Sequence, residues 1–469
     1  MANLVIIGGG PGGYEAATVG RQLGANVTII EEHGIGGSAV LTDVVPSKSL
    51  IATAEIMIRL RHSRELGVVP VDPQLSHPRE AVRADLDSIN KRLIRLANDQ
   101  GDDIRNSLLA AGVKIVSGRG RLLNNRVALA DTADGVRRFP ADMILLATGT
   151  HPRELPDARP DGERILNWKQ LYHLTELPER LIVVGSGVTG AEFASAYNHL
   201  GSDVVLVSSR EMVLPGEDPD AARVIQDVFE ASGMTILSKS RAQSAKRIGD
   251  EVELKLTDGR TVRGSHLLMA VGSIPNTADL GLTENRIEVT GSGHIVVDRV
   301  SRTTAPGVYA AGDVTGVLPL ASVAAGQGRT AVYHSLGEAV SPLDLQSIAS
   351  NVFTAPEIAT VGITQKQVDA GDSSVRSVMV PLKGNARAKM QAHYDGFVKL
   401  FCLPHTGIIV GGVVVAPGAS ELIYALSLCV SARLTVDQAS LAFSVYPSLS
   451  SSIAEAGQRL HTSPGSYFH

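Results

Sequence analysis

Two glycine-rich segments have the residue types and spacing of a dinucleotide-binding loop. The first is Gly8-Gly-Gly-Pro-Gly-Gly13 and the second is Gly185-Ser-Gly-Val-Thr-Gly190. In such a loop the first glycine permits a tight turn, the second lets a pyrophosphate approach the backbone, and the last allows close helix packing, while the N-terminus of the following helix is partly positive. The sequence therefore predicts two nucleotide sites, formed by Gly8, Gly10, Pro11, Gly12 and Gly13 and by Gly185, Gly187, Val188, Thr189 and Gly190.

The residues that end the second strand of each unit predict which ribose fits. Glu31, followed by Glu32, supplies a carboxylate that can accept both hydroxyls of an unmodified ribose. At the equivalent place the second copy has Ser208-Ser209-Arg210, which offers hydroxyl donors and a guanidinium suited to a 2′-phosphate. We therefore expect the second site to accept NADPH. NADH stays open as a donor, because Arg210 could instead be a solvated loop charge.

These loops must be carried by two strand–helix–strand units. The apolar pattern predicts a strand over 3–7, a helix ending at Gly24 and a strand over 26–30, and repeats this plan over 181–207. A long amphipathic helix is expected over 84–112, then short strands with turns at 124–125 and 134–135. The predicted fold class is α/β, with two Rossmann-like domains and a C-terminal α+β domain. The predicted boundaries are 1–150 with 278–345 for the first domain, 151–277 for the second and 346–469 for the third.

Composition limits the function classes. The chain has 469 residues, a formal charge of -5 and 44% hydrophobic residues, as expected for about three globular domains, and this charge argues against nucleic acid as a partner. Cys402 and Cys429 have neither CxxC nor metal-ligand spacing, and we predict two inert core residues and no metal site. Because we find no secretory signal and no apolar run of about 18 residues, we expect a cytoplasmic protein without a membrane span.

Five further motifs occur in a fixed order. They are Val45-Pro-Ser-Lys48, Ala147-Thr-Gly149, Ala270-Val-Gly-Ser-Ile-Pro275, Val308-Tyr-Ala-Ala-Gly-Asp-Val314 and Phe353-Thr-Ala-Pro-Glu-Ile-Ala-Thr-Val-Gly362. With them the sequence resembles the pyridine nucleotide-disulfide oxidoreductases, especially lipoamide dehydrogenase, over essentially its whole length. The resemblance implies FAD at the first loop, NAD or NADP at the second, Asp313 on the flavin's ribityl chain, and a dimerisation domain that makes a homodimer. It also assigns cofactor contacts to Gly37, Ser38, Gly120, Thr148, Gly149, Gly272, Gly312, Leu320 and Ala321.

The sequence departs from this family at its thiol chemistry. The family's redox disulfide lies in a GGxCxxxxCxPSK segment, where this chain has Ala39 and Val44 at the two cysteine positions. The family's C-terminal His and Glu, which move protons for the thiols, are replaced by Tyr446 and Ser451. A phenol is a poor proton carrier at pH 7, since its pKa is normally about 10. Reduction of a disulfide substrate by the family mechanism is therefore not expected.

The flavin apparatus, by contrast, matches the family. Lys48 and Glu192 match a family ion pair beside the flavin, although Glu192 could instead be an exposed helix acid. With Tyr446 they are our candidate catalytic residues, Tyr446 facing an apolar acceptor cavity or only packing there. We expect an FAD-dependent NAD(P)H dehydrogenase that passes electrons to a quinone-type acceptor. The alternatives are a soluble pyridine nucleotide transhydrogenase and a non-catalytic FAD-binding redox sensor.

Overall fold

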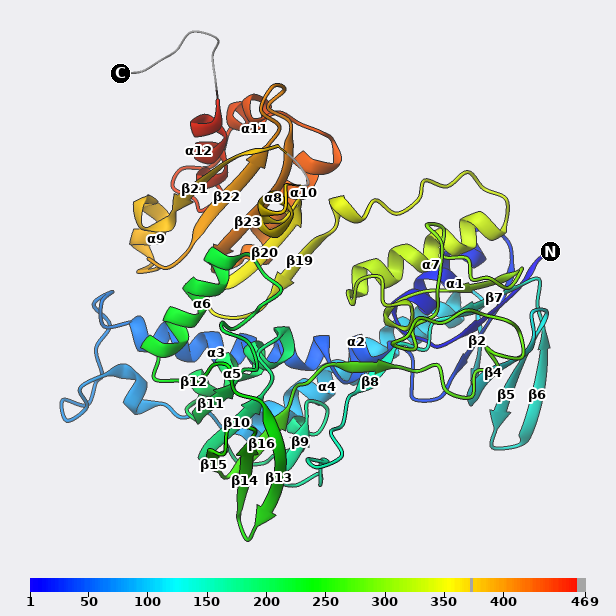
Figure 1. The fold of residues 1–469 in the computed structure, drawn as a ribbon, viewed down its shortest axis with the longest axis horizontal. Helices are drawn as coiled ribbons and strands as arrows, with labels where there is room; N and C mark the ends of the chain where they lie inside the picture. Colours follow the sequence, from blue (N-terminus) through cyan, green and yellow to red (C-terminus); the bar gives the residue numbers. More distant parts are fainter. Residues whose placement is uncertain (372–373, 462–469) are drawn as a thin grey trace. The chain divides into compact units, whose positions relative to one another are not determined.

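The computed structural model describes residues 1–371 and 374–461, which divide into two compact units. Unit 1 comprises Met1–Ser49, Asp87–Arg153 and Gly272–Leu343. Unit 2 comprises Leu50–Leu86, Glu154–Val271 and the described part of the chain from Asp344 onward. The long helices α3 (Val44–His62) and α4 (Leu86–Ala110) both cross from one unit to the other along the chain (Figure 1).

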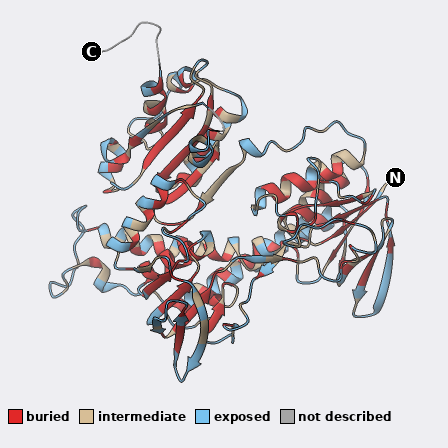
Figure 2. Cartoon of the chain, viewed as in Figure 1, coloured by how far each residue is buried: buried red, intermediate tan, exposed pale blue. Residues whose placement is uncertain are grey.

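Unit 1 is built on a parallel sheet whose strand order is β18-β7-β1-β2-β3. Its strands are β1 (Asn3–Ile7), β2 (Asn26–Glu31), β3 (Lys114–Ser117), β7 (Met143–Leu146) and β18 (Val308–Ala310). Side chains alternate between the two faces of a strand. Leu4 and Ile6 accordingly join one core cluster while Val5 and Ile7 join another. Because both faces are covered, β1 reads as an uninterrupted apolar run, and Figure 2 shows the sheet as buried.

Helices and a small sheet cover the two faces of this parallel sheet. The helices α1 (Pro11–Gln22) and α7 (Ala321–Ser335) pack closely together, and a Cβ at Gly328 would collide with the carbonyl oxygen of Gly12. The core cluster of the other face includes residues of the antiparallel sheet β4-β5-β6. The remaining elements of unit 1 are α2 (Gly37–Leu41), β4 (Arg119–Asn124), β5 (Val127–Thr132), β6 (Gly135–Pro140), β8 (Thr150–Pro152) and β17 (Ser273–Pro275).

Unit 2 contains a second parallel sheet, ordered β12-β11-β10-β16-β9, which repeats the plan of the first. Its strands are β9 (Ile165–Asn167), β10 (Arg180–Val184), β11 (Asp203–Val207), β12 (Thr235–Leu237) and β16 (His266–Met269). The helices α5 (Val188–Leu200) and α6 (Pro219–Ala231) follow β10 and β11 along the chain. An antiparallel sheet is formed by β13 (Ala242–Ile248), β14 (Glu251–Leu256) and β15 (Thr261–Gly264).

The C-terminal part of unit 2 is an antiparallel sheet with helices, ordered β19-β20-β23-β22-β21. The strands are β19 (Ala349–Val352), β20 (Glu357–Gly362), β21 (Arg376–Pro381), β22 (Phe397–Cys402) and β23 (Ile409–Ala416). The helices are α8 (Gln365–Asp369), α9 (Ala386–Met390), α10 (Ala419–Ser431), α11 (Val436–Leu441) and α12 (Ser451–Leu460). Cys402 and Cys429 lie in the core of this part, where burial raises the pKa of both thiols.

The predicted fold class is confirmed. Both strand–helix–strand units form where the sequence places them, and the long helix predicted over 84–112 is α4. The predicted three-domain boundaries stay a prediction, since unit 2 combines residues from the second and third predicted domains. No helix within the described ranges is long and apolar enough to cross a membrane.

Candidate active site

The first glycine loop has the backbone that a pyrophosphate site needs. Gly8 has φ +109°, and a Cβ there would collide with the carbonyl oxygen of Ala147. A Cβ at Gly13 would collide with the carbonyl oxygen of Gly8, so both positions exclude any larger residue. A Cβ at Gly10 would instead lie 3.8 Å from its nearest neighbour, and Gly10 contributes no side-chain cap to α1. The helix N-terminus therefore remains available to a phosphate.

Glu31 ends β2 beside this loop and is held by backbone N–H groups. Its Oε2 accepts from Gly9 N at 2.5 Å, and its Oε1 accepts from His33 N at 2.6 Å and Gly34 N at 3.2 Å. A carboxylate oxygen can accept more than one hydrogen bond, so both oxygens can still receive ribose hydroxyls. Glu32, also a predicted contact, is instead exposed and lies 3.9 Å from the His33 ring.

The second glycine loop reproduces the first. Gly185 also has φ +109°, and a Cβ there would collide with the carbonyl oxygen of Ala270. The helix N-cap Gly187 has φ −72° and ψ −173°, against −75° and −174° at Gly10. Val188 is 43% exposed at the first turn of α5, and a Cβ at Gly190 would collide with the carbonyl oxygen of Gly185. The internal duplication seen in the sequence is thus a duplication of backbone geometry.

Ser208 is placed differently from our prediction. Its side chain is fully buried, with its hydroxyl 2.7 Å from that of Ser186 and accepting from Arg210 N at 3.1 Å. The hydroxyl is therefore used inside the protein rather than presented to a ligand. Ser186 occupies the loop position that Gly9 has in the first copy, so a Ser–Ser hydrogen bond stands where unit 1 has the Gly9–Glu31 contact.

Cationic side chains nevertheless lie at the end of β11. Ser209 and Arg210 are exposed, and Arg210 has no ion pair among the residues that the structure describes. Lys239, which the sequence analysis missed, donates its backbone N–H to the Arg210 carbonyl at 2.8 Å. Its ammonium lies 3.1 Å from Glu211. The pairing of β12 with β11 brings this lysine to the site, and no motif marks it in the sequence.

Glu192 is a buried acid rather than an exposed helix residue. It is 4% exposed on α5, and its Oε1 accepts from the backbone N–H of Phe353 at 2.8 Å. The structure thus connects the second glycine-loop helix to the 353–362 motif, a contact that sequence reasoning missed. Lys48 lies half-buried on α3 within unit 1, whereas Glu192 belongs to unit 2. Their ion pair stays a prediction.

Asp313 has the environment expected of a ligand-binding carboxylate. Burial raises the pKa of Asp313, while a hydrogen bond from Thr150 and the nearby His294 lower it. The Thr150 hydroxyl donates to Asp313 at 3.4 Å, a long contact that leaves most of the acceptor capacity free. Gly312 has φ +80°, and its N–H donates to the Gln327 side chain at 2.7 Å. This half-buried acceptor fits a polyhydroxyl chain such as the ribityl group of FAD.

The remaining predicted cofactor positions have mixed surroundings. The Thr148 hydroxyl donates to the Asn276 carbonyl at 2.8 Å, and the Asn276 amide donates back at 2.8 Å. Gly120 is a glycine for packing, since a Cβ there would lie 2.5 Å from the Ile7 side chain. Gly37 has φ +60°, and a Cβ there would lie 2.7 Å from the Cα of Gly10.

The other predicted positions in unit 1 leave room beside the backbone or lie at a helix terminus. Gly149 and Gly272 have φ +66° and +91°, with nothing within 4 Å of an added Cβ. Ser38 is exposed on α2, and Leu320 and Ala321 form the N-terminus of α7. None of these positions is tested directly by the structure.

Tyr446 lies in an exposed apolar segment of unit 2. It is 81% exposed, and Leu441, Phe443 and Val445 are 77%, 106% and 75% exposed. Asn385, another residue missed from the sequence, fixes the segment that follows. Its amide donates to the carbonyl of residue 448 at 3.0 Å and to the hydroxyls of residues 451 and 452 at 3.2 and 2.9 Å.

Comparison with known proteins defines the class. Residues 2–328 match the pyridine nucleotide-disulphide oxidoreductase family and residues 348–457 match its dimerisation domain. The chain belongs to this family, as the motifs predicted, and it is an oxidoreductase that uses FAD and NAD(P)H. Within the described part of the chain, no three His, Cys, Asp or Glu side chains are grouped to hold a metal ion.

Two relatives and one solved structure narrow the comparison. The chain is 50% identical to a Mycobacterium tuberculosis protein named NAD(P)H dehydrogenase (quinone), over 98% of this chain and 94% of the relative. It is 30% identical to dihydrolipoyl dehydrogenase of Bacillus subtilis, over 97% of each. The crystal structure of LpdA from Mycobacterium tuberculosis matches with a TM-score of 0.93 and 49% identity, covering 98% of this chain and all of that chain.

Proposed function

We propose that this protein is an NAD(P)H dehydrogenase that reduces a quinone-type acceptor through FAD without a disulfide relay. The observation that carries the proposal is a complete pair of nucleotide loops beside a redox segment without cysteine. Ala39 and Val44 stand at the two cysteine positions, and both cysteines of the chain are buried in another core. The 50% identical relative, whose name specifies a quinone, supports the same activity.

The donor side is proposed to accept NADPH. The glycine loop from Gly185 to Gly190 would hold the pyrophosphate at the N-terminus of α5. Arg210, exposed and without an ion pair among the described residues, would bind the 2′-phosphate, with Lys239 beside it. No carboxylate stands where Glu31 stands in the first loop, so a 2′-phosphate meets no repulsion from residue 208.

FAD, when bound, supplies the hydride chemistry between the nicotinamide and the acceptor. The first glycine loop, Glu31 and Asp313 would hold it through its pyrophosphate, ribose and ribityl chain. Lys48 would stabilise negative charge that develops during reduction, and the buried carboxylate of Glu192 would orient the lysine. The hydrogen bond from Phe353 N would fix one oxygen of that carboxylate.

The acceptor side is proposed to be apolar. Ala39, Val44 and Val45 carry no group that could exchange protons with a thiol, and they suit the planar face of a quinone. In the proposed homodimer, Tyr446 of the partner subunit would lie against the acceptor. Its 81% exposure, in an apolar segment of the family's dimerisation domain, suits a residue that becomes covered on assembly.

Anaerobic stopped-flow spectroscopy of the FAD-loaded protein tests this function. NADPH should bleach the flavin, and menadione should restore its colour far faster than NAD⁺ or a disulfide. Reoxidation mainly by NAD⁺ would instead indicate a transhydrogenase, and a flavin that no nucleotide bleaches would reject both enzymes. Lys48→Ala should slow the bleaching step, with the exposed Lys366→Ala as the matched control. Equal rates in the two variants would remove Lys48 from the mechanism.

A further inference from the structure

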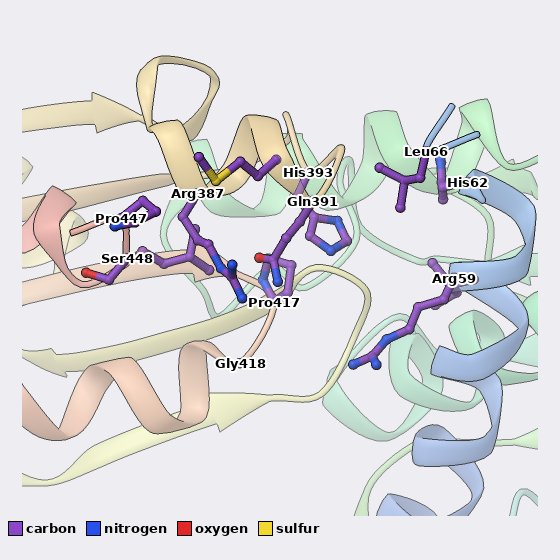
Figure 3. A pocket seen from close by; sticks show the side chains of 13 residues that line it. Arg59, His62, Leu66, Arg387, Gln391, His393, Pro417, Gly418, Pro447 and Ser448 are labelled. Atoms are coloured by element: carbon purple, nitrogen blue, oxygen red, sulfur yellow. The ribbon is translucent and has the colours of Figure 1, made fainter. Parts of the chain in front are cut away.

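Unit 2 contains a cleft of about 840 Å³, which we call the basic pocket (Figure 3). Its lining residues are Ile58, Arg59, His62, Leu66, Arg387, Met390, Gln391, His393, Pro417, Gly418, Pro447, Ser448 and Leu449. None of them belongs to a glycine loop or to the predicted flavin contacts. The volume lies within the range of about 300–1,000 Å³ that is usual for small-molecule sites.

The basic pocket has cationic side chains on opposite walls. Arg59 and His62 project from α3, and Arg387, Gln391 and His393 lie across from them (Figure 3). Neither arginine forms an ion pair or a side-chain hydrogen bond among the described residues. No carboxylate lines the pocket, although acids stand behind both walls: Glu55 and Glu357 near Arg59, and Asp395 near His393.

The charges in the pocket are not balanced from within. Burial lowers the pKa of His393, and the nearby His62 and Arg59 lower it further, while Asp395 opposes the change. His393 is therefore neutral at pH 7, and the two arginines remain charged. Two guanidinium groups that face one concave space create a positive potential that favours an anion.

The rest of the lining is mostly apolar. Ile58 and Leu66 on one wall and Met390 and Leu449 on the other offer aliphatic surface, and two prolines add to it. The amide of Gln391 and the hydroxyl of Ser448 supply neutral hydrogen-bonding groups. A site of this kind suits a molecule with one anionic end and an apolar body, rather than a free inorganic ion.

We propose that the basic pocket binds a small organic anion, a carboxylate or phosphate monoester on an apolar body, between Arg59 and Arg387. This site is separate from the nucleotide and flavin sites, and its occupancy does not depend on the proposed electron acceptor. Pro447 and Ser448 line the pocket and directly follow Tyr446, so an occupant would contact the segment that carries this tyrosine.

Isothermal titration calorimetry of the FAD-loaded protein tests the site with four probes. Octyl phosphate and octanoate should each bind saturably, and the tighter one identifies the preferred anionic group. Inorganic phosphate and 1-octanol, which each supply half of the chemistry, should bind at least tenfold more weakly. These measurements need no NAD(P)H and no acceptor, so their result is independent of whether the proposed activity is found.

Variants locate the binding. Arg387→Gln and Arg59→Gln should each weaken octyl phosphate binding by about fivefold or more, because each removes one charge-assisted contact. Lys389→Gln is the matched control: it removes an exposed charge from α9 but does not line the pocket. Both arginines are exposed and without side-chain partners among the described residues, so the variants should fold, which thermal melting checks.

Three results would overturn the proposal. They are the absence of saturable binding by either amphipathic anion, equal weakening by Lys389→Gln and Arg387→Gln, and 1-octanol binding as tightly as octyl phosphate. The first would be expected if a second copy of the chain covers the pocket. The last would make the site an apolar groove without anion selectivity.

Discussion

Replacing Lys399 with methionine should destabilise unit 2 more than any surface charge change. Lys399 lies on β22 with its side chain 5% exposed. Its ammonium donates to the two oxygens of Asp218 at 3.0 and 2.8 Å and to Asp220 at 2.6 Å. Asp218 is also the N-cap of α6, accepting from Asp220 N at 2.9 Å and Ala221 N at 3.2 Å. One buried ion pair thus connects the antiparallel sheet to a helix of the parallel-sheet part.

The expected magnitude follows from burial. The Asp218 side chain is 2% exposed, so Lys399→Met leaves a buried carboxylate without its cation, at a cost of about 3–5 kcal/mol. The Asp220 side chain is 52% exposed, and Asp220→Asn should cost only about 0–1 kcal/mol. The double variant Lys399→Met with Asp218→Asn should recover part of the loss, because it leaves no unpaired charge and asparagine still caps the helix.

Urea denaturation followed by fluorescence of Trp168 measures these differences. Trp168 is the chain's one tryptophan and is 7% exposed within unit 2. With a slope of about 3 kcal/mol per molar urea, Lys399→Met should lower the midpoint by about 1 M or more. Lys366→Met, at an exposed lysine on α8, is the control and should shift it little. A shift no larger than the control's, or Asp220→Asn as damaging as Lys399→Met, would refute the burial argument.

Three further predictions concern single sites. Ser208→Glu alone should give little NADH preference, because Ser186 occupies the space; adding Ser186→Gly should lower the KM ratio of NADH to NADPH about tenfold, and no gain from that addition would contradict the coupling. Burial lowers the pKa of His199 to about 4, against a hydrogen bond to the Ser195 carbonyl, so stability is full above pH 6.5 and falls towards pH 4; urea midpoints of His199→Gln should fall less over this window, and an unchanged slope would contradict this. Asn385→Ala should cost about 1–3 kcal/mol and expose the Tyr446 segment to protease, whereas Asn385→Asp, which keeps the helix cap, should cost less.

Much of the fold could be predicted from local pattern. An apolar run with both faces buried, a glycine loop and an alanine-rich helix specify one strand–helix–strand unit by short-range chemistry, and the chain contains two. The long helix α4 follows from apolar periodicity in the same way. The grouping of the C-terminal sheet with the 154–271 segment in unit 2 could not be predicted, because it rests on contacts such as Lys399 with Asp218, between residues 181 positions apart.

Site residues were predictable where a motif fixes the backbone and not where the tertiary structure supplies the partner. Gly8 and Gly185 are glycines because positive φ and a nearby carbonyl exclude a side chain, and sequence spacing records that. Phe353 contributes to the Glu192 environment only through its backbone N–H, which any residue except proline supplies. Its side-chain identity therefore carries no signal. Asn385 likewise acts on a segment more than sixty residues further along the chain.

The error at Ser208 has a physical cause that concerns pairs of positions. In the first loop a Cβ at Gly9 would lie 3.1 Å from Glu31 Oε2, so a carboxylate at the end of β2 suits a glycine at the loop's second position. In the second loop Ser186 has a side chain, and its hydroxyl lies 2.7 Å from that of Ser208. The two positions therefore change together, and the loss of the ribose carboxylate is coupled to a residue within the glycine loop itself. Donor specificity here must consequently come from groups outside this buried pair, which leaves Arg210 and Lys239 as the side chains able to distinguish a 2′-phosphate.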